Sequence, residues 1–202
     1  RCVWKLNKFI VTGGNRLNGE ITVQGAKNSV LPILVATLLV NGESVIHNCP
    51  CLSDVDATIR ILEYLGCLVT RDGHTITVDS SIINRYDVPD NLMREMRSSI
   101  VFLGGIMGRM GKAVLSTPGG CEIGLRPIDL HLSSMEQFGA NITTENGCLV
   151  CSSDGKSLQG TRIILSFPSV GATENIILSA VLAKGTTIIS NAAREPEIND
   201  LA

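Results

Sequence analysis

A cysteine lies in a glycine-rich segment that joins a predicted strand to a predicted helix. Residues 116–127 read Ser-Thr-Pro-Gly-Gly-Cys-Glu-Ile-Gly-Leu-Arg-Pro, so Cys121 stands in a bent and mobile loop that has no core for it to fill. Arg126 follows where its charge would favour the reactive thiolate. An ordinary surface cysteine is the alternative, but the loop leads directly into a helix N-terminus, which is a natural anion site. We therefore predict a reactive thiol beside bound anions.

Two further segments place glycine at the start of predicted helices. Lys27 follows Gly25 and Ala26, so its ammonium group and the exposed N–H groups of the first turn can together hold a phosphate or a carboxylate. The run from Ser169 to Thr173 repeats this arrangement with hydroxyl donors. A solvated surface lysine is the alternative for Lys27. Neither segment has the spacing of a P-loop, but two such sites suit a ligand with phosphates at both ends.

Other polar side chains carry weaker signals. Arg94 and Arg97 are predicted to share one face of a helix that begins near Met93, one facing a ligand and the other solvated, and their spacing does not say which. The three histidines stand apart from other metal ligands, so we assign them no role. Glu195 and Glu197 precede a predicted helix. They could stabilise the positive end of its dipole or have a functional role, and the sequence does not decide between the two.

The elements that must position these residues repeat along the chain. An apolar stripe from Val55 to Leu65 ends at Gly66, which is typical of an amphipathic helix closed by a C-terminal glycine. The same stripe and the same glycine recur over residues 128–139. A different segment, Leu39 to Asn48, recurs as Leu182 to Asn191 and indicates a third copy. The chain is therefore predicted to contain one structural unit three times.

Each copy is predicted to run strand, helix, strand, helix and hairpin. The predicted helices are 28–40, 54–65, 93–104 and 129–138, the predicted strands include 44–47 and 113–116, and hairpin turns fall at 72–73 and 146–147. We therefore predict a mixed α/β (α+β) fold whose helices line one side of the sheets and pack together inside. The third copy stops one turn into its second helix and the chain begins with Arg1, so we expect a fragment of a longer chain.

Composition argues against several kinds of partner. The chain has 17 Lys+Arg against 19 Asp+Glu and only 3% aromatic residues, so we expect no nucleic-acid partner. The longest apolar stretch, 30–40, is far too short to span a bilayer and no apolar leader is evident, so we expect no membrane partner and a cytoplasmic location. The seven cysteines include the pairs 49/51 and 148/151, which fit a zinc site or, as we predict, reduced core thiols.

Five motifs together closely resemble those of the UDP-N-acetylglucosamine enolpyruvyl transferases of peptidoglycan synthesis, within the EPSP synthase superfamily. They are Gly-Ala-Lys-Asn at 25–28, Met-Arg-Ser-Ser at 96–99, Pro-Gly-Gly-Cys-Glu-Ile-Gly-Leu-Arg-Pro-Ile-Asp-Leu-His at 118–131, Ser-Val-Gly-Ala-Thr at 169–173 and Asn-Ala-Ala-Arg-Glu-Pro-Glu-Ile at 191–198. The resemblance implies an inside-out α/β barrel domain of three β-α-β-α-β-β repeats with helices packed inside, over residues 22–202 and truncated in its third repeat. Residues 1–21 would be a strand segment that belongs to, or leads from, a second domain missing from this chain.

The resemblance also implies transfer of the enolpyruvyl group from phosphoenolpyruvate to the 3-hydroxyl of UDP-N-acetylglucosamine, with release of phosphate and with no metal or cofactor. Cys121 matches the catalytic thiol that fosfomycin alkylates, on a loop that closes as a lid. The residues that match phosphoenolpyruvate-binding positions are Lys27, Asn28 and Arg126. Those that match nucleotide-sugar positions are Arg97, Arg126, Pro127, Ile128, Asp129, Leu130, Ser169, Val170 and Gly171.

The sequence departs from the family in two ways. Phe167 stands where some relatives have a lysine that contacts phosphate, and the family's aspartate base and a further arginine would come from the missing domain, so we expect the fragment alone to be inactive. An alternative function is that of the shikimate-pathway enolpyruvyl transferase. That enzyme, however, has Lys-Ser in place of Lys27-Asn28 and lacks the Cys121 loop. The second rival is a non-catalytic domain that binds ligands through the same anion sites.

Overall fold

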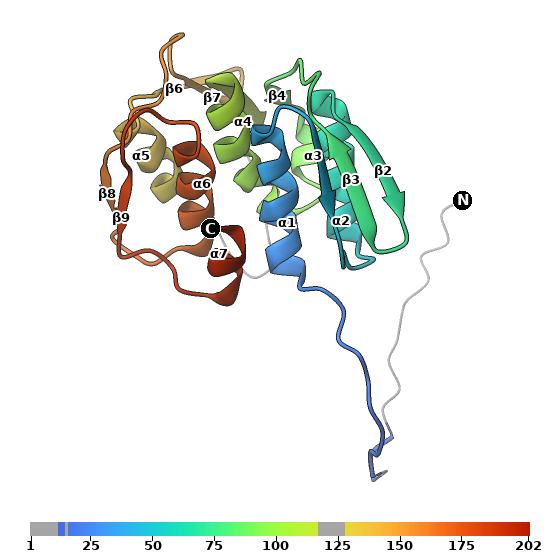
Figure 1. Ribbon diagram of the computed structural model, residues 1–202. Coiled ribbons are helices and arrows are strands. Elements are labelled where there is room, and N and C mark those ends of the chain that lie inside the picture. The colour runs from blue at the N-terminus through green and yellow to red at the C-terminus, as the bar shows by residue number, and fades with distance from the viewer. Residues whose placement is uncertain (1–11, 15, 117–127) are drawn as a thin grey trace.

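The computed structural model describes residues 12–14, 16–116 and 128–202 (Figure 1). The first elements are α1 (Lys27–Ala36), η1 (Thr37–Leu39), β1 (Glu43–Ile46), α2 (Ser53–Leu65), β2 (Leu68–Asp72) and β3 (Thr75–Asp79). The next are β4 (Asp87–Val88), α3 (Asp90–Met93), η2 (Arg97–Val101), α4 (Phe102–Met110), β5 (Lys112–Ser116), α5 (Asp129–Gln137), β6 (Asn141–Glu145) and β7 (Cys148–Ser152). The last are β8 (Arg162–Ile164), α6 (Val170–Ala180), β9 (Ile188–Ser190) and α7 (Pro196–Leu201).

The strands of the described residues form three sheets, one from each copy of the repeat. The first has the antiparallel order β1-β3-β2. The second has the order β4-β5-β7-β6, in which β4 and β5 are parallel and the remaining pairs are antiparallel. The third is the parallel pair β8-β9. A parallel pair requires a crossover, and α4 and α6 supply it in the second and third copies.

The predicted element order is confirmed in the second copy and, as far as its second helix, in the third. The turn between β6 and β7 has positive φ at Asn146 and Gly147, as expected for a tight hairpin. Gly66 and Gly139 follow α2 and α5 with φ of 105° and 89°, which confirms the predicted glycine stops of both helices. The first copy differs, because residues 20–26 form no strand before α1.

Helices α1, α4 and α6 run parallel to one another between the sheets. A Cβ placed on Gly105 would lie 2.6 Å from Val35, and one placed on Gly108 would lie 2.9 Å from both Leu39 and Leu178. A Cβ on Gly104 would lie 2.6 Å from the backbone oxygen of Asn175. Residue numbers therefore rise together along all three helices, so their N-termini and the positive ends of their dipoles share one end of the protein.

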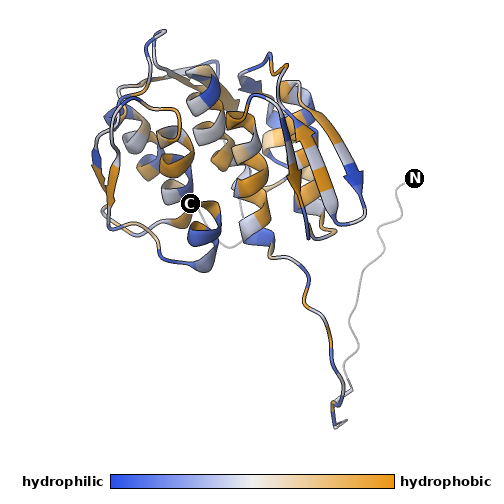
Figure 2. Cartoon of the chain, in the orientation of Figure 1, coloured by the Kyte–Doolittle hydropathy of each residue, from blue (hydrophilic) through white to orange (hydrophobic). Residues whose placement is uncertain are grey.

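Burial explains why these helices lie inside. Apolar residues occur all around α1, and such a helix is stable only when it is covered on every side (Figure 2). Leu34, Val35 and Leu38 are fully buried, as are Phe102, Leu103 and Ile106 at the start of α4. In contrast, α2 buries one face only, as its predicted stripe requires. The glycines of α4 let its neighbours approach closely, which fixes the spacing of the helix starts.

One helix prediction was wrong in its bounds. The sequence predicted a single helix over 93–104, but α3 ends at Met93 and a new helical run begins at Arg97 as η2 and continues as α4. Met96 has φ −143° and ψ 152°, which breaks the helix there. Arg94 and Arg97 therefore do not share a helix face. Residues 93–99 contain neither glycine nor proline, so the sequence carries no helix-stop signal at the break.

Residues 16–26 run away from the body of the protein as an extended segment (Figure 1). Leu17, Ile21 and Val23 are 93%, 91% and 81% exposed. Large apolar side chains exposed to this degree lack a partner within the residues that the structure describes. The segment overlaps the part of the chain that we predicted to belong to, or lead from, a second domain.

Candidate active site

The phosphate-binding candidate Lys27 begins α1 and forms an ion pair across the first turns of two helices. Its Nζ lies 2.8 Å from Oδ2 of Asp54 on α2, and the two side chains are 49% and 29% exposed. Because the pair is accessible to water, its attraction is weak. It orients Lys27 but leaves the ammonium group able to bind an anionic ligand. The ammonium group thus stands at the positive end of α1, as the sequence predicted.

Asn28 and Ser29 join the start of α1 to α7, which lies beside it (Figure 1). Asn28 Nδ2 donates to Glu197 Oε1 at 3.4 Å, and Ser29 Oγ donates to Asp200 Oδ2 at 2.6 Å. Glu197, for which the sequence left two roles open, therefore contacts a predicted substrate-binding residue. The contact orients the amide of Asn28 at the exposed end of α1.

The structure distinguishes between the two arginines that the sequence could not tell apart. Arg94 pairs with Asp90 at 2.7 Å on an exposed surface, so it is the solvated one. Arg97 is half-buried at the start of η2 and forms no ion pair with any described residue. Of these two arginines, Arg97 is therefore the one whose charge no carboxylate of the described residues pairs with.

The start of α6 offers unpaired backbone donors. Ser169 is the N-cap residue, and its Oγ accepts a hydrogen bond from the N–H of Ala172. The N–H groups of Val170 and Gly171 have no acceptor among the described residues, and both residues are half-exposed. The hydroxyl of Ser169 thus serves the helix, and the backbone of the next two residues is free for an anion.

The run Ile128, Asp129 and Leu130 lies at the start of α5, as predicted, and Asp129 is exposed. His131 follows in the same turn, is buried, and contacts Gly171 at the start of α6. The two predicted nucleotide-sugar segments end at residue 130 and begin at residue 169, so they are 39 residues apart in the sequence. The contact between His131 and Gly171 brings them together in the fold. Cys121, Arg126 and Pro127 lie outside the described residues.

Sequence reasoning missed two titratable residues near these helix starts. Burial lowers the pKa of His131 to about 4, although the nearby Asp129 carboxylate opposes this, so the imidazole is neutral near pH 7. Burial, together with the charge of Glu197, raises the pKa of Glu174 on α6 to about 7. No spacing in the sequence identified either residue, because each depends on partners from distant segments.

Comparison with known proteins identifies the family. The sequence profile of EPSP synthase (3-phosphoshikimate 1-carboxyvinyltransferase) matches residues 11–202. The chain belongs to the EPSP synthase family. The UDP-N-acetylglucosamine 1-carboxyvinyltransferase 2 of Caldanaerobacter subterraneus subsp. tengcongensis is 54% identical over 97% of this chain and 46% of its own length. The corresponding enzyme 1 of Symbiobacterium thermophilum is 50% identical over 99% of this chain and 46% of its own length.

Solved structures of the family share this fold. The enolpyruvyl transferase NikO from Streptomyces tendae superposes with a TM-score of 0.80 at 26% identity, over 94% of this chain and 44% of that one. An EPSP synthase from Acinetobacter baumannii superposes with a TM-score of 0.70 at 16% identity, over 90% of this chain and 42% of that one. At this identity the similarity supports the fold alone. This chain thus spans about half the length of the family members that it matches.

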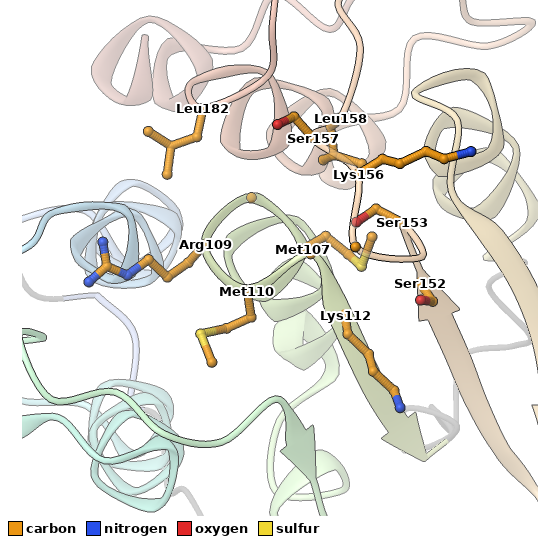
Figure 3. Close-up of a pocket in the computed structure, with 13 residues that line it drawn as sticks. Met107, Arg109, Met110, Lys112, Ser152, Ser153, Lys156, Ser157, Leu158 and Leu182 are labelled. Atoms are coloured by element: carbon orange, nitrogen blue, oxygen red, sulfur yellow. The ribbon is translucent and has the colours of Figure 1, made fainter.

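A hollow of about 360 Å³ lies at the opposite end of α4 from these helix starts (Figure 3). Arg109, Lys112 and Lys156 line it, but their side chains point in different directions. Arg109 donates to Asn41, and the ammonium of Lys112 lies 4.9 Å from the ring centre of Tyr86. These cations do not converge on a common ligand, so the helix starts are the better candidate site.

The cysteines within the described ranges are free thiols. Burial raises the pKa of Cys67 to about 11 and that of Cys151 to about 12, so both thiols are protonated and unreactive at neutral pH. Cys49 is also buried, as predicted for core thiols, whereas Cys51 is exposed. Within residues 12–14, 16–116 and 128–202, no three His, Cys, Asp or Glu side chains could hold a metal, and no helix could cross a bilayer.

Proposed function

We propose that this chain is the N-terminal half of an enzyme that transfers the enolpyruvyl group of phosphoenolpyruvate to the 3-hydroxyl of UDP-N-acetylglucosamine, as in peptidoglycan synthesis. One observation carries the proposal: parallel helices bring Lys27, Arg97 and the unpaired N–H groups of α6 to one end of the protein. Such an end suits two anionic substrates, one with a phosphate and a carboxylate and the other with a diphosphate. The names of the relatives at 45–54% identity support this choice of substrates.

In the proposed reaction, the sugar O3 forms a bond to C2 of phosphoenolpyruvate while a proton is added to C3. The second step expels phosphate from C2 and removes a proton from C3, which restores the double bond. Cys121 would supply the first proton, and Lys27 and Arg97, with Arg126, would stabilise the negative charge of the intermediate. The start of α6 and residues 126–130 would bind the nucleotide sugar. The residues of this chain suit the reaction without a metal or a cofactor.

The rest of the enzyme would lie beyond residue 202. In this proposal a second domain provides the base and a further arginine, and its closure over the helix starts excludes water. The sheets of the present domain would wrap around α1, α4 and α6 as an inside-out barrel. The extended segment 16–26 would connect the two domains. The working location would be the cytoplasm, where both substrates are free small molecules.

Phosphate release by the full-length protein tests the proposal. With phosphoenolpyruvate present, we expect release to depend on added UDP-N-acetylglucosamine. Cys121→Ser should lower turnover by roughly a hundredfold or more, because general acid catalysis contributes about 10²–10⁴-fold. It should also abolish the mass shift that fosfomycin produces. Cys51→Ser, which alters an exposed thiol outside the Cys121 loop, is the matched control and should retain both activities.

Two results would point to the rival functions. Phosphate release that requires shikimate 3-phosphate in place of the nucleotide sugar would identify the shikimate-pathway reaction. Binding of UDP-N-acetylglucosamine to the full-length protein without phosphate release under any condition would identify a non-catalytic binding protein. Either result would overturn the proposed activity.

A further inference from the structure

A buried polar network lies behind the starts of α5 and α6. Asn175 on α6 is fully buried, and its Oδ1 accepts from the N–H of Gly104 at 2.6 Å. Its Nδ2 donates to the carbonyl of Ile100 at 3.0 Å and lies 2.6 Å from Nδ1 of His131. One amide thus contacts η2, α4 and α5 directly.

This network fixes the tautomer of His131. Because Oδ1 of Asn175 faces an N–H and Nδ2 faces a carbonyl oxygen, only one orientation of the amide satisfies both backbone partners. Asn175 Nδ2 is therefore the donor toward His131, and Nδ1 of the ring must accept. The single ring proton of a neutral imidazole then lies on Nε2.

The opposite edge of the ring lies against the start of α6. A Cβ built on Gly171 would be 3.0 Å from Cε1 and 3.5 Å from Nε2 of His131. A methyl group at Gly171 would therefore require the imidazole or the first turn of α6 to move by a few tenths of an ångström. His131 lies one residue after the run 128–130, so the contact sets the distance between the two predicted nucleotide-sugar segments.

We propose that His131 is a positioning residue for the nucleotide-sugar diphosphate, holding the starts of α5 and α6 at the spacing that the ligand requires. The inference rests on the proposed function. Asn175 holds the ring from behind, and the ring supports Gly171, whose N–H is one of the unpaired donors. The side chain acts through these two residues, so its loss should weaken binding of the sugar nucleotide and leave phosphoenolpyruvate, which binds near Lys27, little affected.

His131→Phe in the full-length protein provides the first test. Phenylalanine retains an aromatic ring against Gly171 but cannot accept from Asn175, so the ring loses its support. We expect the Kd for UDP-N-acetylglucosamine, measured calorimetrically on folded protein, to rise about tenfold. The KM for phosphoenolpyruvate should change by less than about twofold, since sites without shared partners behave independently. His47→Phe, which replaces an exposed histidine that follows β1 and does not contact His131 or Gly171, should leave both constants unchanged.

A double-mutant cycle tests the contact with Gly171. Gly171→Ala alone should weaken sugar-nucleotide binding about tenfold, because its methyl group meets the ring. In a His131→Ala background the same change should cost about threefold or less, since the ring is gone. In a His131→Phe background, Gly171→Ala should still weaken sugar-nucleotide binding about tenfold, because an aromatic ring remains. This comparison tests the contact even if the His131→Ala variant fails to fold.

The outcomes separate this inference from the proposed function. If the unaltered protein binds UDP-N-acetylglucosamine and folded His131→Phe binds it equally well, His131 has only a structural role and the inference is wrong. Equal costs of Gly171→Ala in the unaltered and His131→Ala backgrounds would also overturn it. If the unaltered full-length protein does not bind the sugar nucleotide at all, the proposed function fails and this inference falls with it.

Discussion

At the scale of single residues, the ion pair between Lys27 and Asp54 governs how much charge the start of α1 offers a ligand. The ammonium group is attracted both to Asp54 and to an incoming phosphate or carboxylate. Both partners are partly exposed, so water weakens their attraction and the pair contributes about 0–1 kcal/mol. Asp54 is therefore a weak competitor that orients Lys27 in the absence of substrate.

Asp54→Asn should strengthen binding of phosphoenolpyruvate to the full-length protein. An interaction of at most about 1 kcal/mol limits the fall in KM to about fivefold. Lys27→Met should have the opposite effect and raise KM about tenfold or more, because a charge-assisted hydrogen bond is lost. Steady-state kinetics at saturating sugar nucleotide measure both. Asp90→Asn, which breaks the exposed pair with Arg94, is the control, and a comparable fall in KM there would show a general charge effect instead.

At the scale of helices, the glycines of α4 determine where the site lies. Gly104, Gly105 and Gly108 let α1 and α6 pack directly against the α4 backbone, so the three helix starts come close together at one end. In a helix interior alanine is normally preferred over glycine by about 1 kcal/mol. The close packing of α4 must therefore outweigh this preference.

Gly104→Ala tests that balance. Its methyl group would lie 2.6 Å from both the backbone oxygen and Oδ1 of Asn175, so helices α4 and α6 must separate. We expect the free energy of unfolding of the 202-residue chain, measured with urea, to fall by about 1–3 kcal/mol. Ser133→Ala, at an exposed position of α5, should change it by less than about 0.5 kcal/mol. Stabilisation by Gly104→Ala would mean that the helices are not in close contact.

The sequence predicted those elements whose signals are local. The apolar stripe of α2, its stop at Gly66 and the hairpin turn at Asn146-Gly147 each depend on neighbouring residues, and all are confirmed. The break at Met96 was missed because residues 93–99 contain no glycine or proline to signal it, and it is visible only in the backbone dihedrals of Met96. The role of His131 was missed because its partner Asn175 is 44 residues away in the sequence. Family motifs indicate the candidate ligand-binding segments, but only the fold relates these segments in space.

At the scale of the whole molecule, two buried titratable groups have opposite effects on stability. The pKa of His131 falls from 6.5 to about 4 on folding, so the unfolded chain binds more protons between these values and stability rises with pH. The pKa of Glu174 rises from 4.5 to about 7, so the folded chain binds more protons in that range and stability falls as pH rises. Between about pH 4.5 and 6.5 the two contributions offset each other.

Removing either group should reveal the other. In Glu174→Gln, the contribution of His131 remains, so the free energy of unfolding should rise more steeply than in the unaltered chain between pH 4.5 and 6.5, by up to about 3 kcal/mol. In His131→Phe, the contribution of Glu174 remains, and the free energy should fall over the same range by a similar amount. Urea unfolding at several pH values gives these slopes, and the change relative to the unaltered chain removes the contribution of groups common to all three. Identical slopes would show that both side chains titrate in the folded chain as they do in the unfolded one, and neither group would then be held in an apolar environment at the helix starts.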